Sequence, residues 1–307
     1  MKFYSIFDDF DEQAAEIIRG SGILLDIHPA GLPRPDAKRM KHILETYDGV
    51  IIGTTQKIHE DMFDNIRTPR IIATASVGLD HIRIPEDKKH LVTVLNTPKA
   101  NAQSVAEYTI GCALACCKKL TEGRALYAAG KDNKKLSKKP EDLCGKTIGV
   151  VGAGNISKRI MEYAKFFGMQ VLCWTAHPEA HQEIAELGVR FTGLDTLFSV
   201  SDVISVNLPN NPGTVNIISG KRVDMMKPEA IFISVSRKDS VDWQALFTKA
   251  KQNPNFYVCL DLDVNEEIVS NLPDLPNVLV TPHIAGGTVE TRKRMFRELA
   301  EQINCLF

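Results

Sequence analysis

The chain has 307 residues, which is enough for two compact domains or one large α/β unit. Its composition of 44% hydrophobic and 24% charged residues is typical of a globular protein and excludes a disordered or collagen-like chain. Because 37 Lys and Arg residues nearly balance 38 Asp and Glu residues, no overall electrostatic field would attract nucleic acid or an anionic membrane. We therefore expect neither as a partner.

The seven cysteines lack the paired CxxC spacings of a structural zinc site, so we expect no metal. Cys112, Cys116 and Cys117 lie among apolar residues at helical spacing, which is typical of buried thiols. The first ten residues include Asp8 and Asp9 in place of a basic signal segment, and no apolar run approaches the roughly 18 residues that span a bilayer. These features predict a cytoplasmic protein.

Short runs rich in Val and Ile alternate with helical stretches, a pattern typical of parallel sheets covered by helices on both faces. A first series predicts strands near residues 3–7, 22–28, 49–53, 70–75 and 92–96. A long helix over about 101–119 follows these strands. We expect this part of the chain to form a first doubly wound α/β unit.

A second series predicts strands at 147–151, 170–175, 203–208, 230–236, 257–262 and 278–281. Residues 131–140 precede it and are polar and basic, which predicts an exposed connector, although its charges could also form a phosphate patch. After the candidate N-cap Thr288, apolar residues recur at Met295, Leu299 and Ile303. This spacing predicts a final amphipathic helix that packs on the first domain. The fold class is thus α/β, with two doubly wound parallel-sheet domains.

The strand at 147–151 leads directly into a glycine-rich turn, and a helix with apolar periodicity begins at once. The first glycine permits a tight turn, and the second lets the backbone approach a pyrophosphate that binds N–H groups at the helix N-terminus. Ser157 stands where a third glycine usually governs helix-to-strand packing. An ordinary glycine-rich turn is the alternative. The order of strand, turn and helix favours a dinucleotide-binding loop that contains Gly152, Gly154, Asn155 and Ile156.

The next strand ends at Thr175, about 20 residues further on, where an acidic residue would bind the ribose 2′-hydroxyl of NAD. Without a carboxylate there, the 2′-phosphate of NADP is not repelled, and Thr175 and His177 could donate hydrogen bonds to it. The sequence therefore leaves NAD or NADP as the cofactor and supports the hypothesis that NADP is used.

Several motifs between about residues 50 and 300 occur in a specific order. They are Ser76–Ile82, Asn96–Pro98, Ser104–Glu107, the glycine turn, Ser201–Ser205, Met226–Pro228, Arg237, Asp261 to Glu266, and Thr281–Ala285. Together they resemble the D-2-hydroxyacid dehydrogenase family, which includes D-lactate dehydrogenase, phosphoglycerate dehydrogenase and glyoxylate/hydroxypyruvate reductase. The resemblance implies a Rossmann-type dinucleotide-binding domain (99–283) inserted in a flavodoxin-like substrate domain (1–98 plus 284–307). It also implies a homodimer through the helix near 101–119.

The resemblance further implies three catalytic residues. His283, beside Thr-Pro at the end of a predicted strand, would protonate the new alkoxide when a 2-oxo acid is reduced and take that proton back in oxidation. Glu266 would orient the imidazole and favour its protonated form. Arg237 would bind the substrate carboxylate and polarise the carbonyl bond that is reduced.

The remaining candidates would surround the two ligands. Ser76, Val77 and Gly78 would bind the other side of the substrate carboxylate through their backbone, which Gly78 allows to come close. The cofactor would be lined by Leu208 and Pro209 at the adenine, by Val235 and Ser236 beside Arg237, and by Asp261 at the nicotinamide.

We therefore expect an oxidoreductase that transfers a hydride between NAD(P)H and a small 2-oxo or 2-hydroxy acid. The sequence departs from the family at Lys99, Asn207, Lys238 and Glu267, where Gly, His, Gly and Pro are common. The main alternative is a non-catalytic protein that senses a nicotinamide dinucleotide on the same fold, and a methyltransferase that uses S-adenosylmethionine is another. Neither alternative would need Arg237, Glu266 and His283 together.

Overall fold

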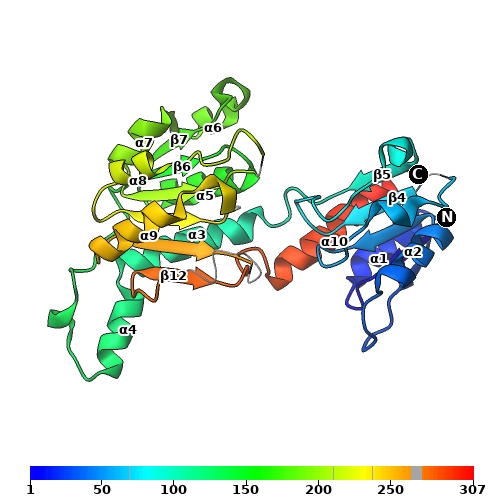
Figure 1. Cartoon of the computed structure of the whole chain (residues 1–307), viewed down its shortest axis with the longest axis horizontal. Coiled ribbons are helices and arrows are strands. Elements are labelled where there is room, and N and C mark those ends of the chain that lie inside the picture. Colours follow the sequence, from blue (N-terminus) through cyan, green and yellow to red (C-terminus); the bar gives the residue numbers. More distant parts are fainter. Residues whose placement is uncertain (69, 210, 237, 264–271) are drawn as a thin grey trace. The chain divides into compact units, whose positions relative to one another are not determined.

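The computed structural model describes residues 1–68, 70–209, 211–236, 238–263 and 272–307. These residues form two compact units, which we call unit 1 (Met1–Asn101 with Thr288–Phe307) and unit 2 (Ala102–Gly287). The unit boundaries fall at residues 101 and 287, whereas the sequence analysis placed them at 98 and 283. Figure 1 labels the elements of each unit.

Unit 1 contains a five-stranded parallel sheet in the order β2-β1-β3-β4-β5. Its strands are β1 (Lys2–Ser5), β2 (Leu24–Ile27), β3 (Gly49–Ile52), β4 (Arg70–Thr74) and β5 (Val92–Leu95). Its helices are α1 (Glu12–Gly20), α2 (Ala37–Thr46), α10 (Val289–Asn304) and the short 3-10 helices η1 (Glu60–Phe63) and η2 (Glu86–Leu91). This strand order is that of the flavodoxin-like doubly wound sheet, which confirms the predicted fold class for this unit.

Helix α10 begins where the sequence predicts, because the side chain of Thr288 accepts a hydrogen bond at its N-terminus. The helix packs against α1 in the core of unit 1. Phe296, Leu299 and Ile303 are buried there, whereas Met295 is only half-buried. Because a helix turns 100° per residue, Phe296 lies closer than Met295 to the centre of the buried stripe.

Unit 2 contains a seven-stranded parallel sheet in the order β12-β11-β10-β9-β6-β7-β8. Its strands are β6 (Thr147–Val151), β7 (Gln170–Trp174), β8 (Arg190–Phe191), β9 (Val203–Val206), β10 (Ile231–Ser234), β11 (Tyr257–Asp261) and β12 (Val278–Thr281). Its α-helices are α3 (Ala102–Cys117), α4 (Leu120–Ala128), α5 (Asn155–Phe166), α6 (Gln182–Glu186), α7 (Leu194–Val200), α8 (Gly220–Met225) and α9 (Trp243–Gln252). The described part of this unit also contains the short 3-10 helices η3 (Asn133–Lys135), η4 (Pro178–Ala180) and η5 (Lys238–Ser240).

The strands of the larger sheet consist mainly of apolar residues because helices cover both of its faces. Ile148 and Val150 of β6 belong to the core that includes residues of α3 and α5. Val151 belongs to the core on the other face, which includes residues of α7, α8 and α9. Successive residues of a strand point to opposite faces, so each strand contributes to both cores.

Strand β6 lies inside the larger sheet, with β7 and β8 on one side and β9 to β12 on the other. The order of the strands therefore reverses between β6 and β9. In open α/β sheets, ligands bind at the carboxyl ends of the strands on either side of such a reversal. The fold of unit 2 thus indicates the turns after β6 and β9 as a binding site.

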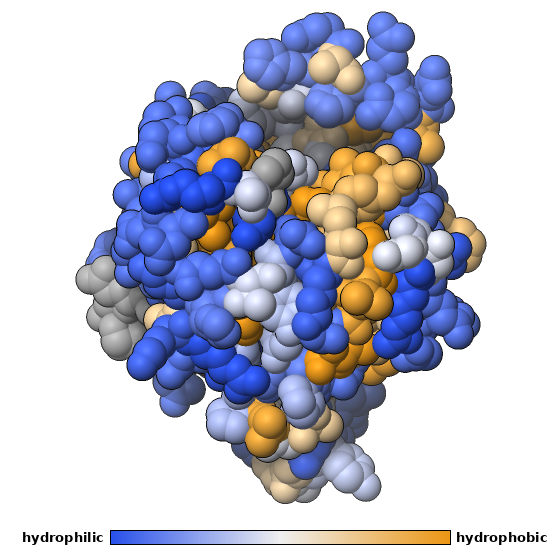
Figure 2. All heavy atoms as spheres, turned by 90° about the vertical axis from the view of Figure 1, so that its right-hand side faces the viewer, coloured by the Kyte–Doolittle hydropathy of each residue, from blue (hydrophilic) through white to orange (hydrophobic). Residues whose placement is uncertain are grey.

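The surface shown in Figure 2 is mainly hydrophilic and carries several separate apolar patches. Exposed large apolar residues in unit 1 include Leu24 near the start of the chain and Leu306 and Phe307 at its end. Among the described residues, no helix has both the length and the apolar character that a membrane crossing requires.

Candidate functional site

The turn that follows β6 needs glycine at its first position. Gly152 has a φ of +105°, which residues with a side chain rarely adopt. A Cβ atom added to Gly152 would lie 2.6 Å from the backbone oxygen of Asn207 and 3.5 Å from the side chain of Leu208. The turns after β6 and β9 therefore pack directly against each other, at the place where the strand order reverses.

The N-terminus of α5 is open beside this turn. Gly154 is the N-cap residue and has no side chain that could bond the first N–H groups of the helix. A Cβ atom added to Gly154 would have no protein atom within 4 Å. Asn155 and Ile156 are the first helical residues, and their end of the helix carries the positive end of the dipole. This arrangement fits the pyrophosphate of a dinucleotide.

Two buried oxygen atoms close to this turn have no hydrogen-bond partner among the described residues. One is Oδ1 of Asn207, whose Nδ2 donates to the hydroxyl of Ser205 at 3.0 Å. The other is Oγ of Ser157 on α5, a residue that is completely buried. A serine therefore fits where a third glycine was expected. The free Oδ1 acceptor of Asn207 suits a ligand that donates hydrogen bonds.

The turn after β7 carries no carboxylate at residue 175. The backbone N–H of His177 donates to Oγ1 of Thr175 at 3.5 Å. The imidazole of His177 lies 3.3 Å from the carboxylate of Glu179, and both side chains are exposed. His177 is thus available at the edge where the ribose of a dinucleotide is expected, but Glu179 adds a negative charge nearby.

Ser236 connects the turns after β9 and β10. Its hydroxyl donates to the backbone oxygen of Val206 at 2.9 Å and accepts from the backbone N–H of Leu208 at 2.7 Å. Pro209 follows Leu208, and its oxygen accepts from Thr214 at 2.7 Å. Ser236 therefore shapes the wall that Leu208 and Pro209 were predicted to form. Val235, the residue before it, is half-buried at the end of β10.

Asp261, the last residue of β11, holds the turn that contains His283. Its carboxylate accepts hydrogen bonds from the hydroxyl of Thr281 at 2.6 Å, from the N–H of Ile284 at 2.8 Å and from the N–H of Ala285 at 2.9 Å. His283 has a φ of +53°, and its side chain is exposed. A left-handed residue costs roughly 1–2 kcal/mol unless it is glycine, although His, Asn and Asp adopt this conformation more often than other residues. Asp261 offsets this cost and presents the imidazole to solvent.

Tyr108 and Thr281 extend this network. The sequence analysis placed Thr281 in a motif without giving it a role, and it did not identify Tyr108. The hydroxyl of Tyr108 on α3 hydrogen bonds Oγ1 of Thr281 at 2.7 Å, and Thr281 in turn donates to Asp261. Burial raises the pKa of Tyr108, so its hydroxyl stays protonated. The sequence showed only that Thr281 precedes Pro282-His283. The hydrogen bond between Thr281 and Tyr108 on α3 depends on the tertiary fold.

In unit 1, the loop after β4 offers two free N–H groups. The carbonyl of Val77 accepts from Nδ2 of Asn96 at 2.8 Å, and the carbonyl of Gly78 accepts from the hydroxyl of Ser76 at 2.8 Å. The carbonyl of Ser76 accepts from the N–H of Thr97 at 2.9 Å. Within the described chain, the N–H groups of Val77 and Gly78 have no acceptor. Adjacent free N–H groups on a fixed loop form a binding site for an anion such as a carboxylate.

Two predicted catalytic residues, Arg237 and Glu266, lie outside the described residues, as does Glu267. Their placement relative to His283 therefore stays a prediction. Among the described residues, no group of three or more His, Cys, Asp or Glu side chains could hold a metal ion.

The sequence family of the chain agrees with this geometry. The family model "D-isomer specific 2-hydroxyacid dehydrogenase, NAD binding domain" matches residues 110–285. Hydroxypyruvate reductase from Thermotoga maritima is 32% identical over 301 residues, which cover 96% of this chain and 95% of that protein. The chain therefore belongs to the D-isomer specific 2-hydroxyacid dehydrogenase family, as its motifs predict. The matched region contains the glycine turn, so the cofactor is a nicotinamide dinucleotide.

Solved structures show the same architecture. An acyclic imino acid reductase in complex with NADPH and D-Arg has a TM-score of 0.82 and 25% identity, and the match covers 100% of this chain and 97% of that one. D-lactate dehydrogenase from Aquifex aeolicus, complexed with NAD and lactic acid, has a TM-score of 0.77 and 25% identity, with 100% and 95% covered. These matches confirm the predicted fold of two parallel-sheet domains.

Proposed function

We propose that the chain is an oxidoreductase that transfers a hydride between a nicotinamide dinucleotide and a small 2-oxo or 2-hydroxy acid. The observation that carries this proposal is the turn at His283, where an exposed imidazole on a left-handed residue is fixed by Asp261. This turn lies at the same edge of the sheet as the glycine turn after β6. The names of the relatives, which include a hydroxypyruvate reductase and a D-lactate dehydrogenase, support the substrate class.

Different residues of the chain bind the cofactor, bind the substrate and transfer the proton. A bound nicotinamide supplies the hydride or accepts it in the reverse direction. Residues 152–156 of unit 2 bind the pyrophosphate. The free N–H groups of Val77 and Gly78 bind the substrate carboxylate. In reduction, His283 donates a proton to the substrate oxygen while the carbonyl carbon gains the hydride, and in oxidation the imidazole takes the proton back.

Arg237 and Glu266 complete this proposal through the family resemblance. The planar guanidinium of Arg237 orients the 2-oxo acid and polarises its carbonyl bond. The carboxylate of Glu266 holds the imidazole of His283 in position and favours its protonated form.

We propose that the enzyme uses NADP(H). Support comes from Thr175, which replaces a carboxylate, and from the exposed imidazole of His177. The variant Thr175→Asp places a negative charge against the 2′-phosphate, and we expect kcat/KM with NADPH to fall roughly ten-fold relative to NADH. Steady-state kinetics of both proteins with both cofactors measures this ratio. A wild-type enzyme that works equally well with both, or better with NADH, would contradict the proposal.

We further propose a homodimer through α3 and the elements beside it. Helix α4, which follows α3, buries none of its residues, and Leu120 and Tyr127 are 59% and 84% exposed. Exposed apolar residues on such a helix are typical of an interface. Light scattering during gel filtration should give twice the chain mass of 34.1 kDa, whereas a mass near 34.1 kDa would contradict the dimer.

The cytoplasmic location predicted from the sequence stays a proposal. All seven cysteines are free thiols, which agrees with a reducing compartment.

The proposed function is tested by purified wild-type protein. We expect loss of NADPH or NADH absorbance when glyoxylate, hydroxypyruvate or pyruvate is added. Titration of NADPH, followed by its fluorescence, establishes cofactor binding in the same sample. Binding of NADPH without turnover of any 2-oxo acid would instead indicate the non-catalytic sensor.

A further inference from the structure

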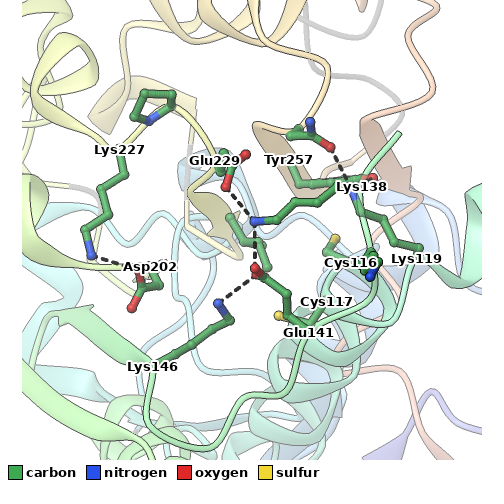
Figure 3. Close-up of a pocket in the computed structure, with 14 residues that line it drawn as sticks. Cys116, Cys117, Lys119, Lys138, Glu141, Lys146, Asp202, Lys227, Glu229 and Tyr257 are labelled. Atoms are coloured by element: carbon green, nitrogen blue, oxygen red, sulfur yellow. Dashed lines mark hydrogen bonds and ion pairs between the residues drawn. The ribbon is translucent and has the colours of Figure 1, made fainter. Parts of the chain in front are cut away.

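A cavity of about 550 Å³ lies at the amino-terminal edge of the sheet of unit 2 (Figure 3). Lys146 precedes β6, Asp202 precedes β9, Glu229 precedes β10, and Tyr257 begins β11. The end of α3 and the connector before β6 complete the walls. In a parallel sheet all strands begin at one edge, so this cavity and the glycine turn lie at opposite edges. The cavity is therefore separate from the cofactor site.

The residues that line the cavity carry more positive than negative charge. Five lysines face it, at positions 119, 138, 139, 146 and 227, against the three carboxylates of Glu141, Asp202 and Glu229. Two positive charges are in excess among the lining residues, and Glu122, which lies outside the lining and 4.0 Å from the ammonium group of Lys119, offsets one of them. Figure 3 shows Lys138 with Glu141 and Glu229 in the middle, the pair of Lys227 and Asp202 on one side, and Lys119 with Tyr257 on the other.

Not every lysine can bind a ligand, because an ammonium group has three N–H donors. Lys119 uses its donors on Asn255 at 2.8 Å, Tyr257 at 2.9 Å and Ser137 at 3.4 Å. Lys227 has one bond, to Asp202 at 2.8 Å, and Lys146 has one, to Glu141 at 2.8 Å, among the described residues. Lys146 and Lys227 therefore each retain two donors for a ligand, whereas Lys119 contributes charge alone.

Lys119 places an ammonium group at a position where burial makes a positive charge energetically costly. The residue is only 4% exposed, yet the three oxygen atoms that bond its ammonium group are uncharged. Its backbone is left-handed, with a φ of +55°. Burial lowers the pKa of Lys119, and Glu122 is 4.0 Å away. Strained backbones and buried charges of this kind occur most often at functional sites.

We propose that this cavity binds a small dianion, such as a dicarboxylate or a phosphate monoester, through Lys146, Lys227 and the exposed Lys139. Lys146 and Lys227 retain two donors each and can bond both charged groups of a dianion, and the volume lies in the range of ordinary ligand pockets. Lys138 and Lys139 of the basic connector 131–140 line the cavity. The proposal therefore gives part of this connector the anion-binding role that the sequence analysis named as an alternative.

The test measures binding to the full chain by calorimetry at constant ionic strength. NADPH is present so that the glycine turn and the proposed 2′-phosphate site are both occupied. Inorganic phosphate and succinate are titrated separately, and acetate serves as the monoanion. We expect at least one of the two dianions to bind more tightly than acetate. The stronger of the two identifies the phosphate or the dicarboxylate class.

Three variants assign the binding to this cavity. Lys227→Met removes a donor and a positive charge, so we expect the dianion to bind about ten-fold more weakly. Glu229→Gln removes a carboxylate that is bonded to Lys138, so we expect binding to become about ten-fold tighter. Lys251→Met, on the exposed surface of α9, should leave binding unchanged.

Lys227→Met is expected to weaken binding of the dianion and Glu229→Gln to strengthen it. This opposition separates a binding effect from damage to the fold, because a misfolded variant would not bind more tightly. If neither dianion binds the wild type at millimolar concentration, the proposal is overturned, and it is also overturned if acetate binds as tightly as both dianions. The proposal would also be overturned if Lys227→Met, Glu229→Gln and the wild type bound the dianion with equal affinity. Because the readout is binding, these results are independent of whether the chain reduces a 2-oxo acid.

Discussion

Asp261 has a role beyond the one its sequence position implies. The resemblance places it at the nicotinamide, which stays a prediction, and its carboxylate also accepts three hydrogen bonds from residues 281, 284 and 285. These residues flank His283, whose backbone is left-handed. We therefore regard Asp261 as a positioning residue that acts through His283.

The variant Asp261→Asn tests this role. The amide nitrogen of the new Asn side chain would face a backbone N–H group whose hydrogen bond the carboxylate accepts in the wild type. Two donors cannot bond each other, so the turn at His283 should loosen. We expect kcat to fall at least ten-fold, with little change in the dissociation constant of NADPH. Asp224→Asn, on the surface of α8, is the matched control. Full kcat in Asp261→Asn would show that the turn needs no support from this carboxylate.

At the scale of elements, the glycine turn and α5 form as the sequence predicts. The spacing of Gly152 and Gly154 and the apolar periodicity after them are local features, and the sequence shows both. Ser157 is different, because its fit depends on how closely α5 approaches the sheet. The structure buries it completely and leaves its hydroxyl without a partner among the described residues.

Removing that hydroxyl should stabilise the protein. A buried polar group without a partner costs about 1–3 kcal/mol, so Ser157→Ala should raise the melting temperature by roughly 2–4 °C. Ser201→Ala is the control, since the hydroxyl of Ser201 donates to Leu197 at 2.7 Å and its loss should lower the melting temperature. Calorimetry of both variants measures the shifts. A lower melting temperature for Ser157→Ala would mean that the hydroxyl does have a partner.

The sequence predicts the bounds of the buried strands well. It does not predict features that depend on contacts between residues far apart in the chain. Strands β6, β9 and β10 are apolar runs and lie within two residues of their predicted bounds. Strand β8 has only two residues, too few for any periodicity, and was missed. The placement of Ser236 at the cofactor stays a prediction, and the sequence did not show that its hydroxyl connects two turns that are 28 residues apart in the chain. No local pattern encodes that contact.

At the scale of the whole molecule, the two units divide the proposed binding functions. The free N–H groups of Val77 and Gly78 belong to unit 1, and the glycine turn and His283 belong to unit 2. Substrate affinity and cofactor affinity should therefore respond to different substitutions.

Asn96→Ala tests this division. The amide of Asn96 fixes the carbonyl of Val77, so its loss should let the loop move and raise KM for the 2-oxo acid. We expect a three- to ten-fold rise, equivalent to roughly 1 kcal/mol, and an unchanged dissociation constant of NADPH. Steady-state kinetics and fluorescence titration measure the two constants. A parallel loss of cofactor affinity would contradict the division.

The central claim is that His283 moves the proton in a hydride transfer. The most direct measurement compares kcat of the wild type and His283→Asn with a 2-oxo acid, together with the dissociation constant of NADPH. Asn tolerates the left-handed backbone, so the turn is preserved. We predict a fall in kcat of about 10²–10⁴-fold with cofactor binding unchanged. A variant that retains kcat within two-fold of the wild type would contradict the account.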